Sequence, residues 1–551
     1  MTRKCKSLIA LMTALCLTAC GAASGGSAAG ADASADTQQT QSGTYDSGLL
    51  KAAINADITT MDVHKTSNDY LVPMNVFDTL FSIVKLDDGS TEIVNRLVDS
   101  YDISEDGKTY HFTLRDGVVF SDGTPLTAQD VKFTFERMLS LPDSQQADFA
   151  IPIDGAQEML DGKADSLRGI TAEDDRNFTV TLTAPFAGFI ASLATPSTSI
   201  LSKKLVTEAG EDFGILPEKT IGTGPYLIKE WKRDHGLVFE YNPRYWGAEP
   251  SVKRVEVTVM DSQTMSMAYQ KGDLDILDCL KIDSAIVNST YKKAPYRDRI
   301  VSADRMGTYF LMLNENVKPL DNLQVRKAIQ RAINREAILS SIFSGDGQLE
   351  DGIFPTGCIG YSKENQSWLT YDPDEARKLL ADAGYAEGFD LELCLDSSAL
   401  DSIKNTMQVI AQNLNDVGIR ATIRTIDHAG YLDLRGSGEM SSYMALWVLD
   451  YNDPDNIIYP FFGTKDNTKI RSNNYGDDEI IARVAAAKTI VDETERNKEY
   501  AFLEKKIIEE DAAWVPMFSL KHLYLISDRV EHFTPHWAGW EDFYFEGTTL
   551  I

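Results

Sequence analysis

The hydrophobic residues of this chain follow strand spacing over several short segments. In residues 110–114, 178–182 and 255–259, apolar side chains occupy every second position. This alternation is typical of strands that have one buried face. A further strand is expected at residues 49–58, and the Asp106–Gly107 dipeptide predicts a hairpin turn.

Helical spacing marks other segments, and it alternates with strand spacing in the second half of the chain. Thr127 and Asp130 predict a helix start, because this pair can form a capping box. Asp372 followed by Pro373 predicts another, with acidic residues at the positive end of the helix dipole. Strand and helix patterns then follow each other in turn, which predicts an α/β domain at about residues 306–515.

The segment at residues 447–456 combines a buried strand with a polar turn. It follows the apolar residues 443–446 and then breaks into acidic residues and a proline. The carboxyl end of a strand is where a sheet usually presents its binding groups. Trp447 and Asp450 at this position can hold an organic ligand by its flat face and its positive end. The alternative is a strand followed by an ordinary Asx-rich turn.

The amino-terminal residues have the pattern of an export signal. A basic start and an apolar run from Leu8 to Leu17, too short to span a bilayer, predict a signal peptide over residues 1–19. The run ends in Leu-Thr-Ala-Cys-Gly, which resembles a bacterial lipobox and implies cleavage before Cys20 and lipidation of its thiol. The alternative is a signal peptide cut elsewhere, with Cys20 incidental. Residues 20–44 are mostly small and polar, which predicts a flexible tether.

Length, charge and cysteine spacing limit the class of protein. For 551 residues, two or three domains are expected. The net charge of −30 argues against nucleic acid as a partner, because phosphates would be repelled. Pro535 separates His532 from His536 and disfavours a helical histidine pair, so no metal or other cofactor is expected. Three cysteines of the body lack paired spacing and predict neither a disulfide ladder nor a zinc site, namely Cys279, Cys358 and Cys394.

Motifs spread over most of the chain form a set. They are Leu114–Val118 with Phe120, Gly123–Glu136, Gly222–Tyr226, Asn242–Trp246, Val325–Ile329 and Ala376–Tyr385. In number, order and spread they resemble extracellular solute-binding protein family 5, the peptide- and nickel-binding receptors of ABC importers. The resemblance implies a bilobal α/β fold of the periplasmic-binding-protein type (type II, large three-domain form). Its two lobes are joined by hinge strands and close on a ligand.

The resemblance also implies a division into domains. Domain I would take residues 45–66, 190–305 and 516–551, domain II would be an insertion at 67–189, and domain III, the second lobe, would be 306–515.

Four residues receive ligand-binding roles from the resemblance. Asp450 matches an aspartate that grips the α-amino group of peptides, and Trp447 matches a tryptophan that lines the same pocket. Tyr309 matches a ligand-side position in the hinge-proximal strand. Arg435 matches a basic residue carried toward the carboxylate end of the peptide, and the alternative is a solvated surface arginine.

Two departures from the family pattern concern the same site. Leu446 stands where a glycine usually precedes the tryptophan, and Met444 stands where some members have a carboxylate-gripping arginine. Ligand length and carboxylate recognition therefore stay open.

The leading hypothesis is a lipid-anchored oligopeptide receptor of an ABC importer, without catalytic residues. It would be a monomer on the extracytoplasmic side of the cell membrane and would deliver its ligand to permease subunits. Alternatives are a receptor for a non-peptide solute, such as a nickel chelate, an opine or an oligosaccharide, and a sensor that signals to a membrane kinase. A hydrolase with Asp450 and Asp453 as a carboxylate pair is disfavoured, because the chain lacks a nucleophile elbow and an H-E-x-x-H motif.

Overall fold

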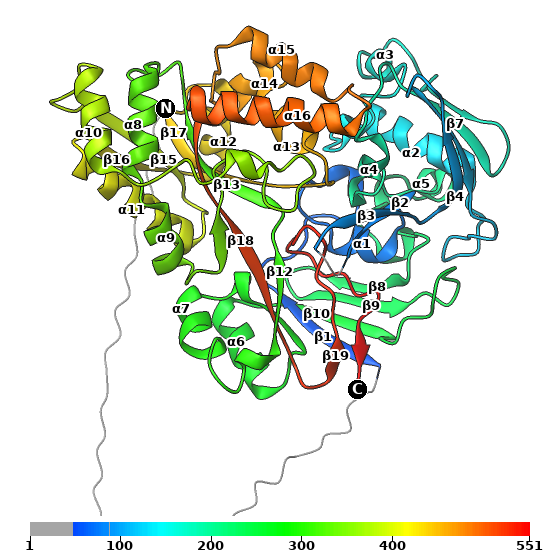
Figure 1. The fold of residues 1–551 in the computed structure, drawn as a ribbon. Coiled ribbons are helices and arrows are strands. Elements are labelled where there is room, and N and C mark those ends of the chain that lie inside the picture. The colour runs from blue at the N-terminus through cyan, green and yellow to red at the C-terminus, as the bar shows by residue number, and fades with distance from the viewer. Residues whose placement is uncertain (1–47, 87–88) are drawn as a thin grey trace, which may run out of the picture. The chain divides into compact units, whose positions relative to one another are not determined.

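The computed structural model describes residues 48–86 and 89–551 of the chain. These residues fold into β-sheets with helices packed around them (Figure 1). The predicted signal peptide and the whole predicted tether, with Cys20, lie outside the described residues. Within the described ranges, no helix has the length and apolar character needed to cross a membrane.

One sheet pairs the first described strand with strands near residue 250. Its order is β1 (Leu49–Ile54), β10 (Arg254–Val259), β9 (Gly236–Tyr241) and β8 (Tyr226–Lys232). β1 runs parallel to β10, and the remaining pairs are antiparallel. The strand expected at 49–58 ends earlier, at Ile54, because the chain then bends so that Asp57 accepts a hydrogen bond of 3.0 Å from the Trp231 indole.

A second, antiparallel sheet and a hairpin follow. The sheet order is β4 (Val98–Ile103), β5 (Thr109–Leu114), β7 (Asn177–Thr181) and β6 (Ile170–Ala172), and the hairpin is β2 (Phe81–Lys85) with β3 (Thr91–Asn95). The predicted turn at Gly107 joins β4 to β5, with a φ of 69° that favours glycine. The predicted capping box is present, since Asp130 accepts hydrogen bonds of 2.8 Å from both the N–H and the hydroxyl of Thr127.

Helices of this part cover the two sheets and the hairpin. They are α1 (Leu71–Val76), α2 (Ala128–Ser140), α3 (Ala156–Leu160), α4 (Phe189–Ser192) and α5 (Lys203–Ala209).

The largest part of the fold is a mixed sheet built mainly from the second half of the chain. Its order is β11 (Ile276–Asp278), β18 (Trp514–Ile526), β13 (Gly307–Leu313), β17 (Ser442–Val448), β15 (Asp390–Asp396) and β16 (Arg420–Ile426), with β12 (Ile300–Asp304) and β14 (Gly347–Leu349) also paired to β18. β15 lies parallel to both β16 and β17, as the alternation of strands and helices predicts.

Helices flank this mixed sheet. They are α6 (Ser262–Lys271), α7 (Ser284–Ile286), α8 (Leu323–Ala332), α9 (Arg335–Ile342), α10 (Pro373–Asp382), α11 (Asp401–Asp416), α12 (His428–Ser437), α13 (Asp455–Phe462), α14 (Lys465–Ile470), α15 (Asp478–Ala487) and α16 (Glu493–Glu504). A final short pair consists of β19 (Val530–His532) and β20 (Thr549–Leu550).

β18 is one continuous strand with different partners along its length (Figure 1). Residues 514–518 pair with β13, whereas residues 521–526 pair with β12 and β11. Only Arg305 and Met306 separate β12 from β13. Two chain segments, β18 and the segment that contains β12 and β13, therefore run together from the strands around β11 and β12 to the strands around β13.

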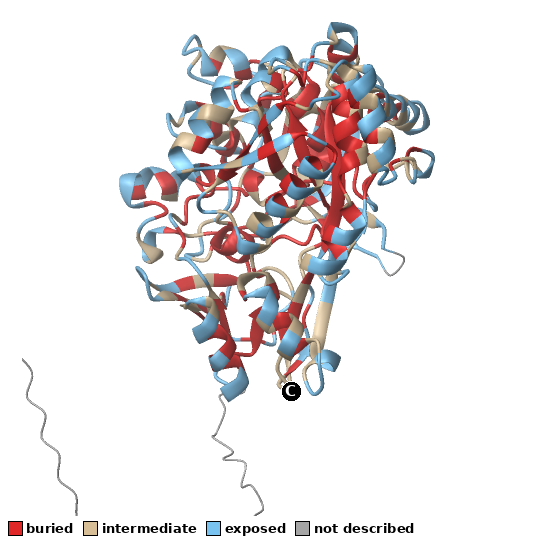
Figure 2. Ribbon diagram, turned by 90° about the vertical axis from the view of Figure 1, so that its left-hand side faces the viewer, coloured by how far each residue is buried: buried red, intermediate tan, exposed pale blue. Residues whose placement is uncertain are grey.

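β13 separates two cores, because its side chains are buried on both faces of the strand. Figure 2 shows that the buried residues, in red, gather in the strands at the middle of the fold. Phe310 and Met312 belong to one hydrophobic cluster, and Tyr309 and Leu311 belong to the other. Strands buried on both faces read as continuous apolar runs, as residues 309–313 do.

Candidate ligand-binding site

The predicted strand-to-turn segment is formed by β17, a loop and the start of α13. Thr308 of β13 pairs with Trp447, so the indole lies on the face that also carries Phe310. The loop then leads directly into α13 at Asp455. Asp450 therefore lies between the carboxyl end of a strand and the start of a helix.

Asp450 is a partly buried carboxylate without a positively charged partner. Its Oδ2 accepts a hydrogen bond of 3.0 Å from the Asn456 amide, and its own N–H donates one of 2.9 Å to Asn456 Oδ1. Among residues 48–86 and 89–551, no lysine, arginine or histidine forms an ion pair with it. Burial raises its pKa from 3.8 to about 6, against the smaller effect of the Asn456 hydrogen bond.

Side chains from distant parts of the sequence surround Asp450. The buried Tyr70 faces it, and burial together with the Asp450 charge raises the pKa of the Tyr70 phenol. The Tyr70 hydroxyl is 3.0 Å from Ser197 Oγ and accepts a hydrogen bond of 3.1 Å from Gln146. The Tyr70 ring lies 4.8 Å from that of Trp540, whose indole N–H donates to Leu449 O at 3.0 Å. These contacts enclose the carboxylate with aromatic and polar groups.

Trp447 shares a hydrogen-bonding partner with Asp450. Its indole N–H donates to Asn456 Oδ1 at 3.3 Å, so Asn456 contacts both residues. The Phe461 ring meets the indole edge-on, with centroids 5.4 Å apart, and the Arg471 guanidinium lies 5.2 Å above the indole ring. Trp447 is only partly buried, so the aromatic surface can also contact a ligand.

Asp453 has a structural role in the loop. It forms an ion pair of 2.5 Å with Arg496 of α16, and both side chains are almost fully buried. Its Oδ1 also accepts a 3.0 Å hydrogen bond from the N–H of Asp455. These contacts agree with the turn-forming interpretation of Asp453, whereas Asp455 begins the helix α13.

Arg435 lies on α12 and is partly buried. Its backbone carbonyl accepts a hydrogen bond of 2.8 Å from Ser472 Oγ. Its Nε is buried and has no hydrogen-bonding partner in the described part of the chain. Arg435 therefore differs from a fully solvated surface arginine.

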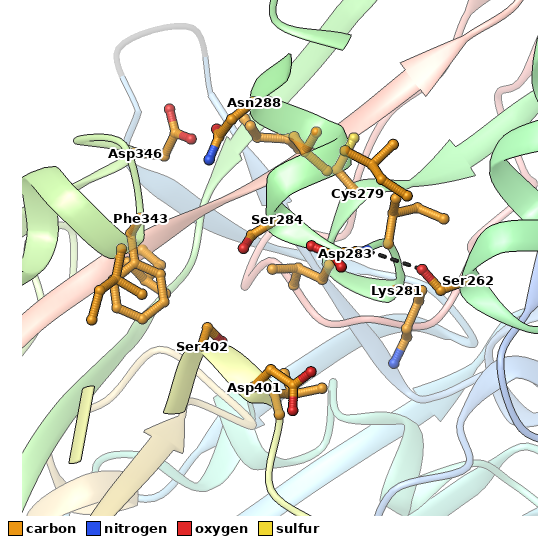
Figure 3. A pocket seen from close by; sticks show the side chains of 18 of the residues that line it. Ser262, Cys279, Lys281, Asp283, Ser284, Asn288, Phe343, Asp346, Asp401 and Ser402 are labelled. Atoms are coloured by element: carbon orange, nitrogen blue, oxygen red, sulfur yellow. Dashed lines mark hydrogen bonds between the residues drawn. The ribbon is translucent and has the colours of Figure 1, made fainter. Parts of the chain in front are cut away.

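Tyr309 lies apart from the other predicted residues. Its side chain points to the face of β13 opposite Trp447 and packs 5.4 Å from Phe518. There it lines a separate cavity of about 640 Å³ with Arg305 and residues of α7 and α11. Figure 3 shows this cavity, with the side chains of Phe343, Asp283 and Asp401 around it. The structure thus brings Trp447 and Asp450 together but not Tyr309.

The sequence did not reveal several neighbours of Asp450 and Trp447. Tyr70 comes from the start of α1, and Arg471 directly follows α14. Neither residue stands in a motif that identifies it. Asn456 lies within the predicted segment, and its amide could have been recognised as a partner for the nearby carboxylate.

Comparison with known protein families assigns the chain to one of them. The model of the middle part of bacterial extracellular solute-binding proteins, family 5, matches residues 92–469. The chain belongs to this family. Family 5 members are solute-binding proteins and not enzymes, so the hydrolase hypothesis is wrong. The predicted resemblance and the type II periplasmic-binding fold are confirmed.

Relatives of this family-5 protein cover nearly its whole length. The probable D,D-dipeptide-binding periplasmic protein of Escherichia coli K12 is 29% identical over 486 residues, which are 87% of this chain and 90% of the relative. The glutathione-binding protein of Salmonella typhi is 28% identical over 499 residues, covering 88% and 91%. A Helicobacter pylori periplasmic binding protein, solved with the peptide STSA, has a TM-score of 0.75 at 27% identity and covers 91% of this chain and 98% of its own.

Proposed function

We propose that this protein is the extracytoplasmic receptor of an ABC importer and that it binds short peptides through their α-ammonium group. The observation that carries the proposal is the Asp450 carboxylate, which is partly buried, hydrogen-bonded only to Asn456 and without a cationic partner in the described residues. Relatives named as dipeptide- and glutathione-binding proteins support a peptide ligand.

An ammonium group would complete the electrostatics of Asp450. It supplies three N–H donors and a positive charge, and charge-assisted hydrogen bonds are roughly twice as strong as neutral ones. Partial burial reduces competition from water, so the interaction is stronger there than at an exposed carboxylate. Trp447 and Tyr70 would contact the apolar part of the same ligand.

The proposal includes the expected domains and a hinge. Residues 45–66, 190–305 and 516–551 would form domain I, residues 67–189 domain II, and residues 306–515 domain III. The crossing of β18 beside residues 305–306 supports a hinge at that point. Ligand contacts that exist only in the closed state would shift a pre-existing equilibrium between open and closed forms.

Membrane attachment is a separate part of the proposal. Lipid on Cys20 would hold the receptor beside its permease, and residues 21–44 would act as the tether. Mass spectrometry of the amino-terminal peptide tests this, with Cys20→Ala as the variant that removes the lipid-bearing thiol. An unmodified Cys20 in the membrane fraction would contradict it.

The amine contact is tested by calorimetry of Asp450→Asn with trialanine and with N-acetylated trialanine. The variant is expected to bind trialanine about 30-fold or more weakly, because a buried charge pair is lost. The natural protein is expected to discriminate against the acetylated peptide by a similar factor. Asp433→Asn, which removes an exposed carboxylate from α12, is the matched control and should bind both peptides normally. Equal affinity of the natural protein for the two peptides would contradict the proposal.

A further inference from the structure

Arg471 is held in place beside the proposed ligand amine site. Tyr443 of β17 donates a hydrogen bond of 2.7 Å to the Arg471 carbonyl. The guanidinium carbon lies 5.2 Å from the Trp447 ring and 5.3 Å from the Phe461 ring. Two aromatic rings and a strand hydroxyl therefore fix the position of this cation.

Arg435 is the neighbouring cation. Ser472, the residue after Arg471, donates a hydrogen bond of 2.8 Å to the Arg435 carbonyl, which ties the two segments together. The Nε atoms of both arginines are buried without hydrogen-bonding partners in the described ranges. Burial and the Arg435 charge lower the pKa of Arg471, as expected for like charges close together.

No carboxylate of the described residues forms an ion pair with either arginine. Tyr443 and the exposed Asp148, which lies in the short 3₁₀ helix Ala147–Phe149, act in the opposite direction on the pKa of Arg471, with smaller effects than burial and Arg435. Two half-buried guanidiniums without counter-ions repel each other, so their closeness favours a bound anion. A guanidinium offers a planar fork of donors that matches a carboxylate.

We propose that Arg435 and Arg471 together form an anion subsite that selects short peptides carrying a second carboxylate besides the carboxyl terminus. The proposal rests on the proposed peptide-binding function and names its ligand class. Within the described residues, Asp450 has no cationic partner and Arg435 and Arg471 have no carboxylate partner, and a ligand with one ammonium and two carboxylates complements these three groups. Arg471 is the specificity-determining residue, because its guanidinium adds the second positive charge beside Trp447.

The test compares peptides that differ by one charged group. Calorimetry is performed with Ala-Ala-Glu and Ala-Ala-Gln, which have nearly the same shape, on the natural protein, Arg471→Met and Asp450→Asn. The natural protein is expected to prefer Ala-Ala-Glu by at least tenfold. In Arg471→Met the ratio of the affinity for Ala-Ala-Glu to the affinity for Ala-Ala-Gln is expected to fall at least tenfold. Methionine keeps the apolar contact with Trp447 but removes the charge. In Asp450→Asn both affinities should fall and the ratio should remain.

The matched control for Arg471→Met is Lys469→Met. Lys469→Met removes an exposed positive charge from α14 two residues before Arg471 and is expected to keep the ratio of the natural protein. Equal binding of the two peptides by the natural protein would overturn the proposal, even if no variant folds. An equal loss of both affinities in Arg471→Met would also overturn it and would assign Arg471 to supporting Trp447. Unchanged binding by Asp450→Asn would refute the amine contact separately.

Discussion

Asp450 carries its charge where water is partly excluded and where Asn456 is its hydrogen-bonding partner. Such a carboxylate is unfavourable for the fold until a cation binds, because desolvation penalises the ionised form. The same residue therefore links ligand affinity, pH and stability. Two predictions follow from this single side chain.

Ligand affinity is expected to fall as the pH falls below 6. The ammonium group needs the ionised form of Asp450, and burial raises the pKa of this carboxyl to about 6 in the empty protein. Between pH 7 and pH 5 the ionised fraction, and with it the affinity for trialanine, should fall about tenfold. Calorimetry over this range checks the slope. Asp450→Asn should lose this part of the pH dependence, and a slope retained in the variant would assign it to another group.

The same substitution is expected to stabilise the empty protein at neutral pH. The folded state raises the pKa of Asp450 from its ordinary value of 3.8 to about 6, so the cost in folding free energy grows between about pH 4 and pH 6 and is fully present above about pH 6. Asp450→Asn should raise the free energy of unfolding at pH 7 by about 1–3 kcal/mol. The gain should disappear below about pH 4, where both states are protonated. Urea unfolding at the two pH values measures it, and a destabilised variant at pH 7 would show that the carboxylate has a structural role.

A local pattern and a family motif coincide at Asp450 and Trp447, and the structure brings these two residues together at Asn456, while their ligand-binding roles stay predictions. Tyr70 and Arg471 come from other segments, and only the folded chain brings them to the site. The strand at Tyr309 was predicted, but a continuous apolar run does not reveal which face a side chain takes. The register with β17 decides this, and it places Tyr309 opposite Trp447.

At the scale of elements, helix starts and half-buried strands were read from the sequence reliably. The Thr127 capping box and the Asp372 cap are both present, because these signals depend on adjacent residues. The helix α13 that follows the Trp447 strand was not predicted. Its start depends on Asp453, whose Oδ1 accepts the Asp455 N–H while Oδ2 pairs with Arg496 of α16, 43 residues away in the sequence.

The ion pair between the loop and α16 gives a prediction about stability. Arg496→Met is expected to lower the free energy of unfolding by about 3–5 kcal/mol, because it leaves Asp453 buried and unpaired. Adding Asp453→Asn should restore most of this loss, since the amide oxygen can still accept the Asp455 N–H. Chemical unfolding of the single and double variants forms a complete cycle. Additive losses would show that the two side chains do not interact.

At the scale of the whole molecule, ligand binding is expected to stabilise and compact the protein. Saturation with trialanine at 100 times its dissociation constant should raise the free energy of unfolding by about 2.7 kcal/mol. Small-angle scattering should show a smaller radius of gyration with ligand. At the same peptide concentration Asp450→Asn, which is expected to bind about 30-fold more weakly, should gain only about 0.9 kcal/mol or less. A ligand that stabilises the protein without compaction would contradict closure by a hinge.

The place of β18 in the mixed sheet has a consequence for the order in which the fold can be completed. Of the strands in that sheet it is the last to leave the ribosome, yet it contributes the edges on which β13, β12 and β11 pair. Until residues 514–526 have been synthesised, these earlier strands lack a neighbour that no other segment supplies. A nascent chain therefore cannot complete this sheet before residues 514–526 have emerged from the ribosome, however early its other strands form.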